Sequence, residues 1–183
     1  MQLILAAARD YYSTRKKIWL KILVATIPAI IVGLCLMFIS FKSNATTGKV
    51  IVDLGGLFKD FINVQIGAIA ILVSFSVAMI TILVSADNPN IEKLKETLST
   101  ECKPRNGEAL NLFQVLLSNI TYNVLIEVLY LVFLIICIFL QLYVGNNIYK
   151  WLMSISMFFI VHILHILLES VGQMYLTFWK KIG

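Results

Sequence analysis

Four long apolar runs, each almost free of charged residues, dominate the pattern along the chain. They cover residues 22–41, 61–84, 122–143 and about 148–174. Each run has at least the ~20 residues that a helix needs to cross a hydrocarbon core of ~30 Å. Helices are expected because lipid offers the backbone amides no partners. The pattern therefore predicts an all-α integral membrane protein with four transmembrane helices.

Polar and breaker residues between the runs predict the organisation of the rest. Asn88 is a suitable N-cap, Pro89 suits the first helical position and Glu92 suits the first turn. We expect one cytosolic helix from Pro89 to about Ser99, and a second helix that starts at Glu108 and continues into the third span. The predicted segments are an N-terminal interfacial helix (1–21), transmembrane helices 1 and 2 (22–84) with an outer loop (42–60), a cytosolic helical hairpin (85–119), transmembrane helices 3 and 4 (120–175) and a cytosolic tail (176–183).

Composition and charge add an orientation. The 183 residues are 60% hydrophobic and 14% charged, with a mean hydropathy of +0.89; soluble domains are ~25% charged. Eleven of the 15 lysines and arginines fall in the N-terminal segment, the loop between spans two and three, and the tail. Because basic residues collect on the cytoplasmic side, both termini are predicted to be cytoplasmic. The net charge of +5 is attributed to this bias, so no direct nucleic-acid binding is expected.

Four ionisable side chains inside the third and fourth spans are the main candidates for chemistry. Glu127, His165 and Glu169 are predicted to lie in one layer on the cytoplasmic side, with His162 near the midplane. Ionisable groups in a span are costly and usually face the bundle interior or a wet cavity. Three interpretations remain open: polar contacts that hold helices together, a proton-sensitive or ion-permeable constriction, and a metal site. The third is the least favoured, and no metal ligands are assigned.

Two further groups of residues indicate contacts rather than catalysis. Gly67, Ala70, Ser74 and Ala78 form a stripe of small residues on the second span, which would allow a close approach by another helix. The hairpin carries mixed charges that suit docking of a soluble protein, at Glu92, Lys93, Lys95, Glu96, Lys103 and Arg105. No common nucleotide-binding, hydrolase or metalloprotease motif occurs, and the three cysteines imply no disulfide framework. An enzyme and a bound cofactor are therefore not expected.

Two function classes fit these observations. One is an oligomeric membrane scaffold or sensor that docks a cytosolic partner, and the other is a small oligomeric ion channel gated through the Glu127, His165 and Glu169 layer. Four spans with the hairpin "DNPNIEKLKE…EALNLFQVLLSNITYNVLIEVLY" resemble the membrane subunit of Kiwa, a bacterial anti-phage defence system (the KwaA-like family). The resemblance covers the whole chain as architecture. It implies a homotetramer in the inner membrane that senses phage infection and docks a cytosolic DNA-binding effector.

Overall fold

The computed structural model confirms an all-helical chain with four long apolar helices. It describes residues 2–16, 18–43, 53–85, 89–99, 102, 104 and 108–179. The helices in this part of the chain are α1 (Gln2–Thr14), α2 (Ile18–Ser43), α3 (Leu54–Ser85), α4 (Pro89–Glu96), α5 (Leu112–Leu140) and α6 (Asn146–Trp179). Of these, α2, α3, α5 and α6 are long and apolar enough to cross a membrane. The fold is therefore compatible with a multi-pass membrane protein.

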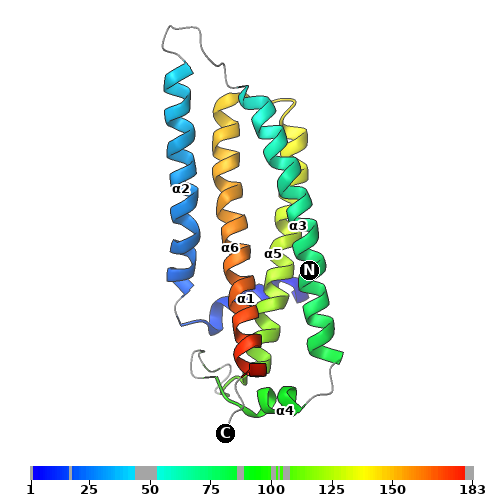
Figure 1. The fold of residues 1–183 in the computed structure, drawn as a ribbon. Coiled ribbons are helices and arrows are strands. Elements are labelled where there is room, and N and C mark those ends of the chain that lie inside the picture. Colours follow the sequence, from blue (N-terminus) through cyan, green and yellow to red (C-terminus); the bar gives the residue numbers. More distant parts are fainter. Residues whose placement is uncertain are drawn as a thin grey trace.

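The four long helices stand side by side, with α6 at the centre of the packing (Figure 1). α2 packs mainly against α6, while α5 packs against both α3 and α6. The largest apolar core lies between α3, α5 and α6. Its most deeply buried large side chains are Phe58, Ile62, Ile69, Tyr130, Leu134 and Ile163. Much of the remaining apolar surface is exposed on the single chain, as expected of helices that face lipid.

α4 lies at one end of the bundle, below the ends of α3 and α5, and we call this end the α4 end (Figure 1). The expected start at Pro89 agrees with the structure, but the helix ends at Glu96 instead of Ser99. The chain there turns to pair with the approach to α5, since Ser99 N donates to Leu110 O at 2.8 Å and Leu112 N donates to Thr97 O at 2.9 Å.

α5 is one continuous helix of 29 residues, as the absence of a breaker predicted. It begins at Leu112 instead of Glu108. The reason is a capping box in which the Asn111 side chain accepts from Gln114 N at 2.8 Å and the Gln114 side chain accepts from Asn111 N at 3.1 Å. Such a box satisfies amide donors that a helix start otherwise leaves free.

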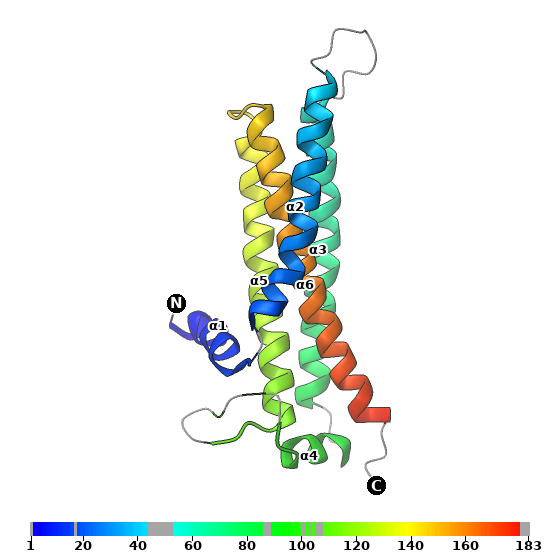
Figure 2. The same cartoon turned by 90° about the vertical axis from the view of Figure 1, so that its left-hand side faces the viewer.

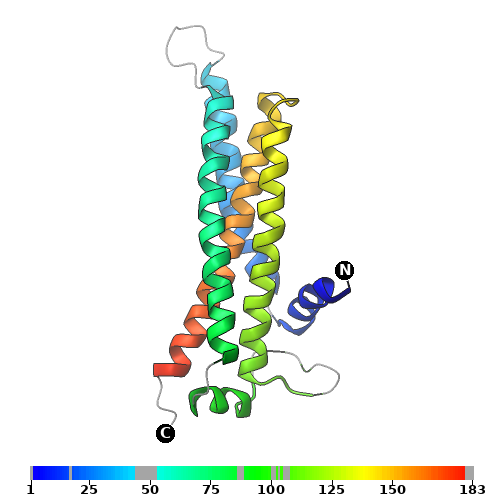
Figure 3. The same ribbon diagram turned by 90° about the vertical axis from the view of Figure 1, so that its right-hand side faces the viewer.

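α1 lies across the axis of the bundle, beside α5 (Figures 2 and 3). It ends at Thr14, and α2 starts at Ile18, so the expected N-terminal helix is shorter than 1–21. Tyr11 on α1 packs against Tyr122 and Ile166 in a small apolar cluster of its own. This docking places the polar residues at the end of α1 against the bundle.

Candidate functional site

The structure places the four ionisable residues predicted in the third and fourth spans in different surroundings. Glu127 on α5 and His162 on α6 are buried, with 0% and 3% of their surfaces exposed. Glu169 on α6 is partly exposed and pairs with Lys21 of α2. His165 is half-buried. The structure therefore gives Glu127 and Glu169 separate partners on opposite sides of the bundle.

Glu127 belongs to a buried group with Ser76 and Asn123, which we call the Glu127 cluster. Ser76 Oγ donates to Glu127 Oε1 at 2.9 Å, and Asn123 Nδ2 donates to the same oxygen at 2.7 Å. Asn123 Nδ2 also lies 3.3 Å from Ser76 Oγ. All three residues are fully buried, yet Glu127 Oε2 and Asn123 Oδ1 accept no hydrogen bond from the described residues. The cluster joins α3 to α5 and leaves two buried acceptors open.

A line of hydroxyl and imidazole groups connects α1, α5 and α6. Tyr12 Oη lies 2.8 Å from Tyr122 Oη, which in turn lies 3.2 Å from His162 Nε2. The Tyr11 ring stacks on the Tyr122 ring, with centroids 4.0 Å apart and planes at 4°. The buried His162 thus reaches α1 through two tyrosines.

Arg15, just beyond α1, makes hydrogen bonds to α5 and to the segment between α4 and α5. Its side chain is 5% exposed. Nη2 donates to Asn119 Oδ1 and, at 3.3 Å, to Val115 O, while Nη1 donates to Cys102 Sγ at 3.1 Å. Asn119 Nδ2 donates in turn to Gln173 Oε1 on α6 at 3.3 Å. Arg15 therefore joins the end of α1 to α5, to α6 and to the segment between α4 and α5.

An ion pair between Lys21 and Glu169 completes this side of the bundle. The Lys21 ammonium also lies 5.9 Å from the centroid of the Tyr11 ring. Burial is the main reason that the pKa of Tyr11 is raised well above its ordinary value of 10.0, and the negative charge of Glu169 adds to the effect. The pair ties α2 to α6 next to the docked α1.

We call the residues that make these connected contacts the polar layer. Its members are Tyr11, Tyr12, Arg15, Lys21, Asn119, Tyr122, His162, Glu169 and Gln173. Within the described part of the chain, no three His, Cys, Asp or Glu side chains are placed to hold a metal ion together. The arrangement can transmit a rearrangement between helices, because its side chains bond across helix boundaries.

The predicted small-residue stripe on α3 faces away from the other helices of the chain. Gly67, Ala70, Ser74 and Ala78 are all exposed, and a Cβ atom added at Gly67 would meet nothing within 4 Å. α3 instead packs through its opposite face, which includes Ile69. The stripe therefore remains a smooth, unoccupied surface on the single chain.

The charged residues predicted on the hairpin lie on the outward side of α4. Glu92, Lys93, Lys95 and Glu96 are exposed; Lys103 and Arg105 lie outside the described residues. The apolar side of α4 is buried through Ile91 and Leu94. α4 thus buries its apolar side against the rest of the chain and presents its charged residues at the α4 end.

Several members of these groups were missed by sequence reasoning. Asn119, Asn123 and Glu127 recur every four residues, so they share one helical face, and this polar spacing within an apolar helix could have indicated them. The role of Arg15 had no such signal, because it lies in a basic run that suits the positive-inside rule equally well.

Comparison of the chain with protein-family models, curated proteins and solved structures found no significant match.

Proposed function

We propose that this protein is an oligomeric scaffold or sensor of the bacterial inner membrane that docks a soluble cytosolic protein at the α4 end. In this proposal α2, α3, α5 and α6 cross the bilayer, and both chain termini are cytoplasmic. The distribution of lysine and arginine supports that orientation. The resemblance to the Kiwa membrane subunit extends the proposal to a homotetramer that detects phage infection and holds a DNA-binding effector. No catalytic step and no direct contact with nucleic acid is assigned to this chain.

The observation that carries the proposal is the position of Arg15. It contacts Asn119 of α5 and Cys102 of the segment after α4 at the same time. A movement of α1 or α5 must therefore break or shift contacts with the segment between α4 and α5. Buried polar groups are costly to leave without partners, so the state reached after such a movement must form new contacts in their place. This requirement favours two discrete states, which a sensor needs.

The exposed face of α4 supplies a suitable docking surface. It presents two lysines and two glutamates to water at the α4 end. Charges of both signs on a short helix suit recognition of a soluble protein with a complementary pattern. The helix has little freedom to adapt, because Ile91 and Leu94 fix its other side.

The stripe on α3 supports self-association. Helices in lipid associate through close packing of small residues, because the hydrophobic effect gives no driving force for association there. Gly67, Ala70, Ser74 and Ala78 form such a surface, and all four are exposed on the single chain. We assign them to the interface between copies.

The test is the particle mass of the protein purified in mild detergent, alone and after co-expression with the products of its neighbouring genes. A homo-oligomer that gains the mass of a soluble protein supports the proposal, and a monomer that gains nothing overturns it. Lys93→Glu with Lys95→Glu should abolish the added mass and preserve the oligomer. Lys59→Glu, on an exposed position of α3 at the other end, is the matched control and should preserve both.

A channel is the second candidate, and the open acceptors of the Glu127 cluster favour it. Glu127 Oε2 and Asn123 Oδ1 are buried and accept from no donor among the residues that the structure describes, and a cation or a proton would satisfy them. Planar-bilayer recording separates the two functions. A specific conductance that Glu127→Gln abolishes would establish the channel, whereas a silent bilayer with a partner-bound oligomer would favour the scaffold.

A further inference from the structure

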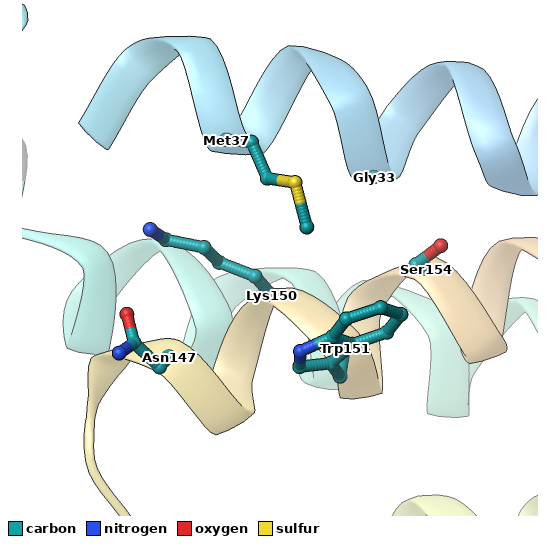
Figure 4. A pocket seen from close by; sticks show the side chains of 6 residues that line it. All are labelled: Gly33, Met37, Asn147, Lys150, Trp151 and Ser154. Atoms are coloured by element: carbon teal, nitrogen blue, oxygen red, sulfur yellow. The ribbon is translucent and has the colours of Figure 1, made fainter. Parts of the chain in front are cut away.

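A pocket of about 190 Å³ lies between α2 and α6, at the end of the bundle opposite α4. It is lined by Gly33, Met37, Asn147, Lys150, Trp151 and Ser154 (Figure 4). This volume is well above the ~10–15 Å³ that a single water molecule needs. It can therefore hold a small polar group with the first part of an attached chain.

Helix packing explains why the pocket exists. Ser154 Oγ donates to Ala29 O at 2.6 Å and holds α6 close to α2 below the pocket. Gly33 permits this approach, since a Cβ atom at that position would lie 3.1 Å from Ser154 Oγ. Beyond this contact the two helices are separated by the space that Met37 and Lys150 line (Figure 4).

The depth of the pocket corresponds to a membrane interface. Asn147 is the first residue of the apolar stretch of α6, and Phe38 is the last of that of α2. From Asn147 to Ser154 the helical rise is about 10 Å. The pocket therefore extends from the end of the two spans about 10 Å into them. Trp151 is 61% exposed at this depth, where amphipathic rings favour the headgroup region.

Polar and apolar groups are ordered along the pocket. The Asn147 amide and the Lys150 ammonium lie toward its outer end, while Met37 and the Trp151 ring lie deeper (Figure 4). No acidic side chain lines the pocket, and none among the described residues pairs with Lys150. The first turn of α6 adds the positive end of a long helix dipole. Among the described residues, the site thus has the positive charge of Lys150, without an acidic partner, above an apolar groove.

We propose that this pocket binds a phospholipid with an anionic headgroup. The lipid phosphate accepts hydrogen bonds from Lys150 and Asn147, and the start of one acyl chain lies along Met37 and Trp151. A free phosphate ion shares the headgroup chemistry but leaves the apolar part of the groove unfilled. The assignment requires only that α2 and α6 lie in a bilayer, and it does not depend on the partner or trigger of the proposed function.

Native mass spectrometry of the detergent-purified, delipidated protein tests the assignment. We expect one added phosphatidylglycerol per chain, with several-fold weaker binding of phosphatidylcholine and no effect of inorganic phosphate. Lys150→Gln should weaken phosphatidylglycerol binding about five- to tenfold, because it removes a charged donor, and Lys150→Arg should restore it. Lys59→Gln removes an exposed lysine at the same end and away from the pocket, so it should leave the affinity unchanged.

Three results with the variants and with phosphate would overturn the assignment, and a fourth concerns the headgroup. They are unchanged binding by Lys150→Gln, an equal loss in Lys59→Gln, and competition by inorganic phosphate as strong as that by the lipid. Equal affinity for both lipids would reject the anionic headgroup. Lys150 is partly exposed, so its substitution leaves the packing of α2 on α6 intact, and each result reports on lipid binding itself.

Discussion

Replacing Arg15 with methionine should release α1 from the bundle while the four long helices stay assembled. The substitution keeps most of the side-chain length but removes three hydrogen bonds from a charged donor. Such bonds contribute about 1.5–3 kcal/mol each, and the cost of burying the guanidinium offsets several kcal/mol of that total. We expect a net loss of about 2–3 kcal/mol in the free energy that holds α1 docked, in keeping with these two ranges.

Hydrogen–deuterium exchange of the amides around Tyr11 measures this free energy directly. A loss of 2–3 kcal/mol raises the population of the undocked state, and hence the exchange rate, by about 30- to 140-fold. Amides in the core of α5 near Leu134 should keep their protection, because they open only with the whole bundle. Thermal unfolding would miss this distinction, since it reports the bundle and not α1 alone.

Arg9→Met on the exposed side of α1 is the matched control. It changes helix charge and apolarity in the same way but removes none of these contacts. Exchange that is equal in Arg15→Met and in the parent protein would refute the reasoning, because Arg15 would then not hold α1. An equal increase in Arg9→Met would trace the effect to the lost charge instead of the lost contacts.

Three other predictions concern the polar layer. Tyr122→Phe should lower the stability measured by thermal unfolding in detergent by about 1–3 kcal/mol, as expected when a buried polar group loses its partner; Tyr12→Phe should cost less, because Tyr12 is 44% exposed, and equal losses would contradict this. Lys21→Met and Glu169→Gln should be non-additive by about 0.5–3 kcal/mol in a double-mutant cycle, whereas additive losses would argue against their ion pair. Burial raises the pKa of Tyr11 above 10.0, so Tyr11 keeps its phenol proton while α1 is docked. The thermal midpoint should therefore stay constant below pH 10 and fall above it. Tyr11→Phe should make that fall smaller.

The long helices could be predicted from the sequence because their cause is local. An uninterrupted apolar run of sufficient length determines a helix in lipid without reference to any other segment. Boundaries were less accurate where a helix extends beyond its apolar run. α3, for example, starts at Leu54 and includes Lys59 and Asp60, although its predicted span starts at 61. Charged residues do not end a helix; they only end the part that suits hydrocarbon.

The partners of the polar residues could not be predicted, because they depend on how each helix is rotated about its axis. From the sequence, Glu127 and Glu169 are predicted to lie at the same depth on neighbouring helices, but depth alone does not identify their partners. In the structure Glu127 points to Ser76 on α3 while Glu169 points to Lys21 on α2. Periodicity fixes which residues of one helix share a face, but the neighbour of that face is decided by the packing of the whole bundle.

The two ends of the bundle differ in the kind of hydrogen bond that joins the helices. Away from α4, the inter-segment bonds run from a side chain to a backbone carbonyl, as from Ser154 to Ala29 and from Gln141 to Gly55. In the polar layer most of them join side chain to side chain, as between Tyr12 and Tyr122, although Arg15 also donates to the Val115 carbonyl. A bond to a backbone carbonyl holds a helix at a fixed register, whereas two side chains can exchange partners through rotamer changes alone. The polar layer is therefore the part of this fold that can rearrange without unwinding a helix. It lies where α1 meets α5 and the segment between α4 and α5.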